Sequence, residues 1–212
     1  MFVGAFVLVA CTSTPAPPEW QMNAKGSVER AADAGLRGDS KIEAAEFARA
    51  RAEVARTGRP DWVARVELLR CATRVAALDF APCVGFEAVA QDAAPAEQAY
   101  ARYLAGTASA SDAALLPQAH GALAAGATAP DAALAAIADP LSRLVAAGVL
   151  LRRDQATPGV IEQAVNSASA QGWRRPLLAW LGVQQQHAQA GGATQEAARI
   201  QRRIDVVLQG QR

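Results

Sequence analysis

Apolar residues recur every three or four positions along most of the chain from Glu19 onward. This spacing places them on one face of an α-helix, and the strict alternation that is typical of a half-buried strand does not occur. Glycine, proline and small polar residues, which end and begin helices, interrupt the pattern. The interruptions fall at residues 38–39, 58–60, 79–83, 106–111, 126–130, 154–158, 172–176 and 191–192. The sequence therefore predicts an all-α fold of antiparallel helical hairpins that form a single domain over residues 19–212.

Two stretches of the chain resemble the tetratricopeptide repeat, a pair of antiparallel helices with small and aromatic residues packed between them. In the first stretch the matching positions are Ala31, Gly38-Asp39, Phe47 and Ala50. In the second they are residues 178–182, which read Leu-Ala-Trp-Leu-Gly, and the glycine pair at 191–192. Ser27 and Ala34 stand where the family usually has Trp and Tyr. The resemblance implies a tetratricopeptide-like stack, and an irregular helical bundle is the alternative because a stack needs at least three repeats.

The N-terminal segment has the pattern of a signal peptide. Residues 2–10 are continuously apolar, and Cys11 and a polar, proline-rich stretch follow them. A helix of this length spans about 14 Å, whereas the hydrocarbon core of a bilayer is about 30 Å thick. The segment is therefore too short for a transmembrane anchor and is predicted to be a signal peptide over residues 1–10.

Leu8-Val9-Ala10-Cys11 resembles the lipobox of bacterial lipoproteins, although the basic residue that usually precedes the apolar segment is missing. The resemblance implies cleavage after Ala10, a lipid-modified Cys11 that becomes the N-terminus, and a proline-rich tether over residues 11–18. In this family a non-acidic residue after the cysteine, here Thr12, implies the outer membrane, with the domain on its periplasmic side. An ordinary apolar N-terminus with a buried Cys11 thiol is the alternative.

If Cys11 carries a lipid, Cys71 and Cys83 remain, and an even number of cysteines in an exported protein favours a disulfide. The helix that starts at Pro60 should continue to about Leu78, which puts Cys71 about 10 Å before its end. Bridged Cα atoms lie within about 7 Å of each other, so residues 79–83 must run back, extended, along this helix. Two separate buried thiols are the alternative.

The composition narrows the class of protein. The chain is 51% hydrophobic and 19% charged, with a formal net charge of +1, which excludes a disordered chain and disfavours a nucleic-acid-binding protein. Residues 39–79 interleave acidic and basic side chains, as on a solvated, ion-paired surface, and Glu43 and Glu46 are expected there. Residues 104–151 are almost uncharged and are expected to form the buried middle of the fold. Asp139, Pro140 and Arg143 argue against a transmembrane span in this stretch.

The chain has no sequence motif of a catalytic, metal or cofactor site. Gly-x-Ser-x-Gly, Ser-x-x-Lys, a glycine-rich phosphate loop and His-Glu-x-x-His are all missing. The two histidines, His120 and His187, have no second ligand three or four residues away, so we expect packing residues and neither a metal nor a cofactor. The four tryptophans would make a binding site only if they converge, and core packing is the default expectation.

Four arginines near the C-terminus are a candidate contact for an anionic group or an acidic partner. Thr157 and Thr194 are expected to cap helices that end at Gly172 and Gly210, and a further helix should run over residues 176–190. Antiparallel packing of these helices would gather the arginines at one pole. They are Arg174, Arg175, Arg202 and Arg203. Alternatively, these side chains complement the partial negative charge of helix C-termini.

Two functions fit these patterns. The first is a non-enzymatic lipoprotein that faces the periplasm and serves another envelope protein as an interaction scaffold or adaptor. The second is a helical lipoprotein that binds a small molecule or a glycan, with or without catalysis, in a cleft of the uncharged middle. A pocket that joins His120 or His187 to two carboxylates would favour the second function.

Overall fold

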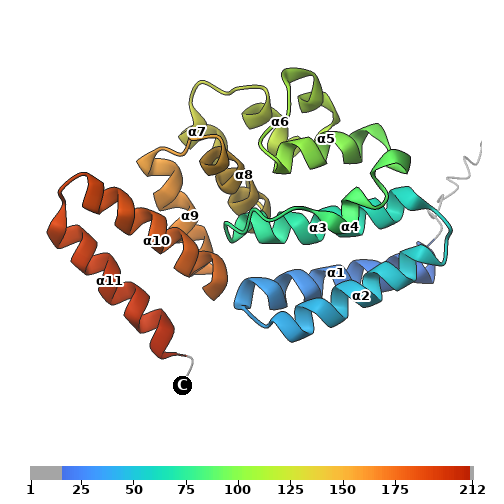
Figure 1. The fold of residues 1–212 in the computed structure, drawn as a ribbon, viewed down its shortest axis with the longest axis horizontal. Helices are drawn as coiled ribbons and strands as arrows, with labels where there is room; N and C mark the ends of the chain where they lie inside the picture. Colours follow the sequence, from blue (N-terminus) through green and yellow to red (C-terminus); the bar gives the residue numbers. More distant parts are fainter. Residues whose placement is uncertain (1–15, 211–212) are drawn as a thin grey trace, which may run out of the picture.

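The computed structural model describes residues 16–210, and within this range the fold is all-α without a strand (Figure 1). Neighbouring helices pack as antiparallel hairpins, which confirms the predicted fold class. The predicted signal peptide, the lipobox and Cys11 lie outside the described residues. Between residues 16 and 210, no helix combines the length and the hydropathy that crossing a membrane requires.

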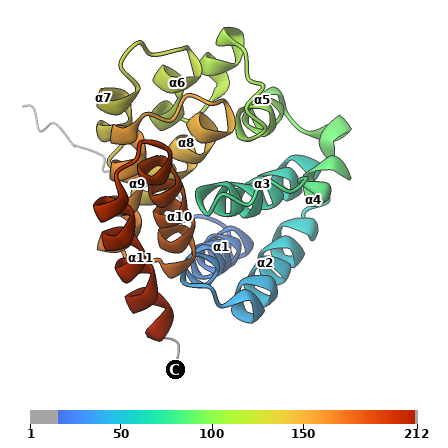
Figure 2. The ribbon, with the colours of Figure 1, turned by 60° about the vertical axis from the view of Figure 1, so that its left-hand side comes forward.

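The hairpin of α1 and α2 lies beside α10 of the last hairpin, α10 and α11, and α5, α6 and α7 lie on the other side of α3 and α8 (Figures 1 and 2). The α-helices in chain order are α1 (Glu19–Arg37), α2 (Ser40–Ala55), α3 (Pro60–Ala76), α4 (Val84–Glu87), α5 (Pro95–Leu104), α6 (Gln118–Ala124), α7 (Pro130–Ala135), α8 (Pro140–Arg152), α9 (Pro158–Ala170), α10 (Arg174–Ala190) and α11 (Thr194–Gln209). Two 3-10 helices, η1 (Ala90–Asp92) and η2 (Ala110–Leu115), flank α5. Each predicted interruption coincides with a boundary between two of these elements.

The middle of the chain is more fragmented than the pattern predicted. α5 begins at Pro95, α6 directly after Pro117 and α8 at Pro140. Proline has no amide hydrogen and disfavours a helical conformation of the residue before it, so a helix ends and a new one begins at each site. The expected burial of residues 104–151 holds over residues 144–150 of α8, which are all buried, whereas many residues between 105 and 143 are exposed. α7, in contrast, buries only Leu134 among its residues.

Small buried residues let α1 and α2 of the first hairpin approach each other closely. Ala31 of α1 and Ala50 of α2 are completely buried, and Phe47 is 3% exposed beside them. The chain turns at Gly38, whose φ of +95° favours glycine. Asp39 then caps α2, because its carboxylate accepts the amide hydrogen of Ile42 at 3.1 Å. The residues that resemble the repeat therefore lie where two helices meet.

Cys71 and Cys83 form a disulfide with Cα atoms 5.9 Å apart, as predicted. Leu78, at φ +60°, reverses the chain after α3, and residues 79–83 run back along the helix. The Arg74 guanidinium holds this segment, since it donates to the Asp79 carboxylate at 2.8 Å and to the Pro82 carbonyl at 3.4 Å. The disulfide thus joins α3 to the segment that leads into α4.

The expectation that Glu43 and Glu46 lie on a solvated surface is wrong, because both are under 10% exposed. Glu43 accepts from Arg175 at 2.9 Å, and Glu46 accepts from Arg30 at 2.9 Å and Arg49 at 2.7 Å. Buried carboxylates need such partners, since desolvation otherwise penalises their charge. The partner of Glu43 comes from α10, so this ion pair joins the first hairpin to the last.

α3 and α8 cross at Gly148, where a methyl group would meet the backbone. A Cβ atom at Gly148 would lie 2.5 Å from the carbonyl oxygen of Val75 and 3.0 Å from its Cγ1. We expect Gly148→Ala to lower the free energy of unfolding by about 1–3 kcal/mol, because over-packing pushes the helices apart. Gly182→Ala in α10 is the matched control, since an added Cβ there meets nothing within 4 Å. This control should raise the free energy of unfolding by about 0.5–1 kcal/mol, because alanine favours the helix. Urea unfolding of both variants would contradict the prediction if the two changes had the same sign.

Candidate functional site

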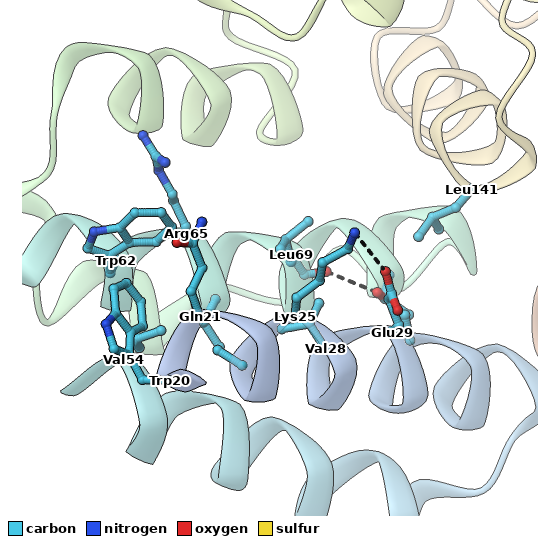
Figure 3. Close-up of a pocket in the computed structure, with 14 residues that line it drawn as sticks. Trp20, Gln21, Lys25, Val28, Glu29, Val54, Trp62, Arg65, Leu69 and Leu141 are labelled. Atoms are coloured by element: carbon cyan, nitrogen blue, oxygen red, sulfur yellow. Dashed lines mark hydrogen bonds and ion pairs between the residues drawn. The ribbon is translucent and has the colours of Figure 1, made fainter. Parts of the chain in front are cut away.

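A groove of about 450 Å³ opens between α1 and α3, and we call it the α1–α3 groove (Figure 3). Its walls are apolar side chains from four helices. They are Trp20, Ala24 and Val28 of α1, Val54 of α2, Trp62, Val66 and Leu69 of α3, and Leu141 of α8. Pockets for small ligands are commonly of this size and are lined mainly by apolar and aromatic side chains.

Helical spacing brings these residues to one face of each helix. Trp20, Ala24 and Val28 follow one another at four-residue steps along α1, and Trp62, Val66 and Leu69 form a corresponding stripe on α3. Either stripe is visible in the sequence. The sequence does not show that the two stripes face each other across an open space, so the groove was not predicted.

Trp20 and Trp62 close one end of the groove. Their rings meet edge to face with centroids 5.3 Å apart, a favourable geometry for aromatic pairs. The guanidinium of Arg65 lies 4.7 Å from the centre of the Trp62 ring and donates to Glu97 of α5 at 2.5 Å. Two of the four tryptophans therefore converge, and α5 supports the same end of the groove.

Polar side chains are confined to the edge of the groove. Lys25 and Glu29 of α1 form a largely exposed ion pair at 3.9 Å, as Figure 3 shows, and such exposed pairs are weak. The Thr73 hydroxyl at the far end donates to the carbonyl oxygen of Leu69 at 2.9 Å. The groove thus presents hydrocarbon to a ligand, with charge only near its rim.

The helices that carry the predicted arginine pole start and end slightly differently from the prediction. Thr157 caps α9 as predicted, since its hydroxyl accepts from the Val160 amide at 3.1 Å. Thr194 is instead the first residue of α11, and Ala193 occupies the cap position. α10 begins at Arg174, which places Arg174 and Arg175 in its first turn.

The structure places the four arginines in two different environments. Arg175 donates to Glu43 at 2.9 Å and to Ser40 at 2.7 Å, and Arg174 lies against Gly38 at the turn between α1 and α2. These two side chains therefore hold the first hairpin against α10. Gly38 is the C-cap of α1, so the alternative role, complementing a helix C-terminus, still fits Arg174, whereas Arg175 is paired with Glu43.

Arg202 and Arg203 lie in the middle of α11, and the last turn of that helix contains no basic residue. They edge a recess of about 360 Å³ beside α10 and α11, which we call the α11 recess. Its lining is Ser169, Leu177, Leu181, Arg199, Arg202, Arg203, Val206 and Val207. Within residues 16–210 neither Arg202 nor Arg203 forms a hydrogen bond or an ion pair. Whether this pair contacts an anion or an acidic partner stays a prediction.

The histidines do not form a catalytic arrangement with carboxylates in the described part of the chain. His120 is 2% exposed, and its Nδ1 lies 3.2 Å from the Tyr103 hydroxyl. Burial lowers the pKa of His120 to about 4, and the charge of Asp139 opposes this shift. A substrate has no access to a ring this deeply buried. His187 lies exposed on α10.

Metal-ligating side chains do not cluster either. Among residues 16–210 no group of three or more His, Cys, Asp or Glu side chains is arranged to hold a metal ion. No protein-family model, curated protein or solved structure shows significant similarity to the chain. Three features of the protein therefore bear on its function: the α1–α3 groove, the α11 recess and the N-terminal sequence.

Proposed function

We propose that the protein is a lipid-anchored, non-enzymatic adaptor that faces the periplasm and binds an acidic segment of another envelope protein. The α11 recess is the observation that carries this proposal. Its edge combines the Arg202 and Arg203 side chains with Val206, which is 69% exposed. The lipobox pattern around Cys11 supports the anchor.

The chemistry of the recess favours an acidic amphipathic helix as the bound segment. Leu177 and Leu181 form an apolar floor, being 9% and 0% exposed. A partner helix with an apolar residue over Val206 would bury that side chain, and neighbouring carboxylates would pair with Arg202 and Arg203. Such paired contacts steer association and set specificity more than they add affinity.

The alternative function, a small-molecule or glycan binder, gains support only in part from the structure. At the edge of residues 104–151, Leu104, Ala105 and Thr107 line a pocket of about 450 Å³ together with residues of α3 and of segment 80–87. The groove of the same volume between α1 and α3 lies outside residues 104–151, apart from Leu141. Sugars require convergent hydrogen-bonding groups, which the apolar walls of this groove do not supply. If the protein binds a small molecule in this groove, the chemistry of the walls favours an apolar ligand.

The anchor is tested by cell fractionation. Cys11→Ser should move the protein from the membrane fraction to the soluble fraction or leave it uncleaved, because stable anchoring requires the acyl chains. Mass spectrometry of the N-terminal peptide should show a diacylglycerol on Cys11. A cleaved Cys11→Ser protein that stays with the membrane would refute the anchor.

The partner site is tested by photocrosslinking in living cells. A photoreactive amino acid at Val206 should capture one acidic envelope protein, whereas the same amino acid at Ile42, which is 49% exposed on α2, should not. Arg202→Gln with Arg203→Gln should reduce the capture about tenfold or more and weaken its dependence on salt. Lys41→Gln with Arg70→Gln removes two exposed charges elsewhere and is the matched control. Equal capture at both positions, or capture that survives the recess variant, would rule out this site.

A further inference from the structure

The walls of the α1–α3 groove have the chemistry of a site for hydrocarbon. A site built for a polar ligand leaves hydrogen-bonding groups in its walls, because buried polar groups of the ligand need partners. Here the floor consists of Ala24, Val28, Val54 and Val66, and the Thr73 hydroxyl is bonded to Leu69. The other polar side chains of the lining are Gln21, next to Trp20 at one end, and the exposed Lys25, Glu29 and Arg65. A ligand that makes no hydrogen bonds along most of its length fits such a groove best.

The shape of the groove fits a long, thin ligand. The lining residues of α1 extend from Trp20 to Ala32, and those of α3 extend from Trp62 to Thr73. At 1.5 Å per residue these spans correspond to about 18 Å and about 17 Å. The tryptophan pair lies at one end, and Leu141 of α8 lies toward the other end (Figure 3). The groove therefore runs along both helices, as an extended chain would.

The start of the described chain lies at the tryptophan end of the groove. α1 begins at Glu19, and Trp20 and Gln21 already line the groove. Residues 16–18, Ala-Pro-Pro, are exposed directly before it. The segment from Cys11 to Glu19 is rich in proline and reaches about 25 Å at about 3.1 Å per residue. A group attached to Cys11 can therefore reach every part of the groove.

We infer that the α1–α3 groove binds one fatty-acyl chain, and that the chain it holds is part of the protein's own lipid on Cys11. This inference rests on the lipid anchor of the proposed function. A short tether raises the local concentration of the attached chain to the millimolar range, which favours it over free lipids. The groove would shelter this chain from water while the protein is away from a bilayer. In the membrane the chain moves into surroundings that are equally apolar.

The first test uses the mature chain, residues 11–212, with Cys11→Ser so that it carries no lipid. A dibrominated stearic acid, kept below its micelle concentration, is the probe, because bromine quenches tryptophan fluorescence on contact. We expect saturable quenching of Trp20 and Trp62. Trp20→Phe with Trp62→Phe should abolish the saturable quenching, since Trp173 and Trp180 lie on α10 or at its start, away from the groove.

The matched variants are Leu69→Glu and Ile42→Glu. Leu69 lines the groove and is 40% exposed, and Ile42 lies on α2 outside the groove and is 49% exposed, so neither change buries a charge in the core. Leu69→Glu should weaken probe binding about tenfold or more, because a carboxylate then faces the hydrocarbon chain. Ile42→Glu should leave probe binding unchanged. Circular dichroism and urea unfolding of both variants check that the fold is intact.

Three results of the first test would overturn the inference. One is the absence of saturable quenching, and another is binding that Leu69→Glu does not weaken. The third is a dimer of the unacylated chain that Leu69→Glu dissociates, because the groove would then be an interface between two copies of the protein. Sedimentation analysis at the concentration of the binding experiment detects that dimer.

The second test uses the acylated protein. Freed of detergent, it should remain monomeric and bind the probe about tenfold more weakly than the unacylated chain, since its own acyl chain occupies the groove. Acylated Leu69→Glu should instead associate through its exposed lipid. If Cys11 carries a lipid and probe binding is undiminished, the anchor stands and the inference is overturned. If mass spectrometry finds no lipid on Cys11, the anchor itself fails, and the first test still decides whether the groove binds an acyl chain.

Discussion

Replacing Trp180 with alanine is expected to lower the free energy of unfolding by about 3–5 kcal/mol, a large share of the total stability of a domain this size. The Trp180 side chain is completely buried in α10. Its indole N–H donates to the carbonyl oxygen of Ala76 at 3.1 Å, near the end of α3. Truncation would leave a cavity where α3 and α10 meet and would also remove the donor from a buried carbonyl group.

Phenylalanine variants separate the hydrogen bond from the packing. Trp180→Phe should cost about 1–3 kcal/mol, because the Ala76 carbonyl loses its partner while most of the ring volume remains. Trp62→Phe is the matched control, since the buried Trp62 indole nitrogen has no hydrogen-bond partner among the described residues. Urea unfolding of the disulfide-bonded protein measures both effects. A loss for Trp62→Phe as large as that for Trp180→Phe would show that the hydrogen bond contributes little.

Acidification is expected to destabilise the protein through His120. Burial sets the pKa of His120 at about 4 in the folded protein, whereas an unfolded chain has a histidine pKa of about 6.5. Between these two pH values the unfolded chain binds more protons, so this contribution is complete above pH 6.5 and is lost as the pH falls toward 4. At 1.36 kcal/mol per pKa unit, the loss is about 2 kcal/mol at pH 5 and about 3 kcal/mol below pH 4.

His120→Gln tests this contribution, because an amide oxygen can still accept a hydrogen bond from Tyr103 but does not titrate. The difference in unfolding free energy between pH 7 and pH 5 should be about 2 kcal/mol smaller in this variant than in the wild type. His187→Gln, which replaces an exposed histidine of α10, should leave the difference unchanged and is the matched control. Parallel pH profiles of the wild type and His120→Gln would contradict the prediction.

Together, the proposed lipid anchor and the two surfaces would give different parts of the chain different roles. The α1–α3 groove begins beside residues 16–18, and the α11 recess lies on the last hairpin, at the left of Figure 1. Under our proposals the α1–α3 groove binds an acyl chain of the protein's own lipid, and the α11 recess binds a partner protein. Separate variants probe the two surfaces, so either surface can lose its proposed role while the other keeps it. Absence of a lipid on Cys11 would remove both the anchor and the acyl chain proposed for the groove.

The sequence by itself determined the secondary structure and one covalent link. Helical periodicity and local breakers such as Gly38-Asp39 and Gly191-Gly192 act over a few residues, so the positions of most helix ends were predictable. The disulfide between Cys71 and Cys83 was predicted from the even number of cysteines that remain if Cys11 carries a lipid. The limit on the distance between bridged Cα atoms then predicted that residues 79–83 run back along the helix. The prolines at positions 95, 117 and 140 mark where the middle of the chain divides into short helices. The apolar pattern continues across these prolines, so the sequence analysis predicted longer helices there.

Only the tertiary structure decided which apolar and charged faces meet. Glu43 is buried because Arg175, 132 residues away, supplies its partner, and the expected arginine pole is divided for the same reason. Trp20 and Trp62 form the end of a groove because α1 and α3 pack side by side and leave space above their stripes. The period of a helix fixes which residues share a face, but it does not fix the angle at which that face meets another helix. That angle depends on packing between distant segments, such as the close contact of Gly148 with Val75.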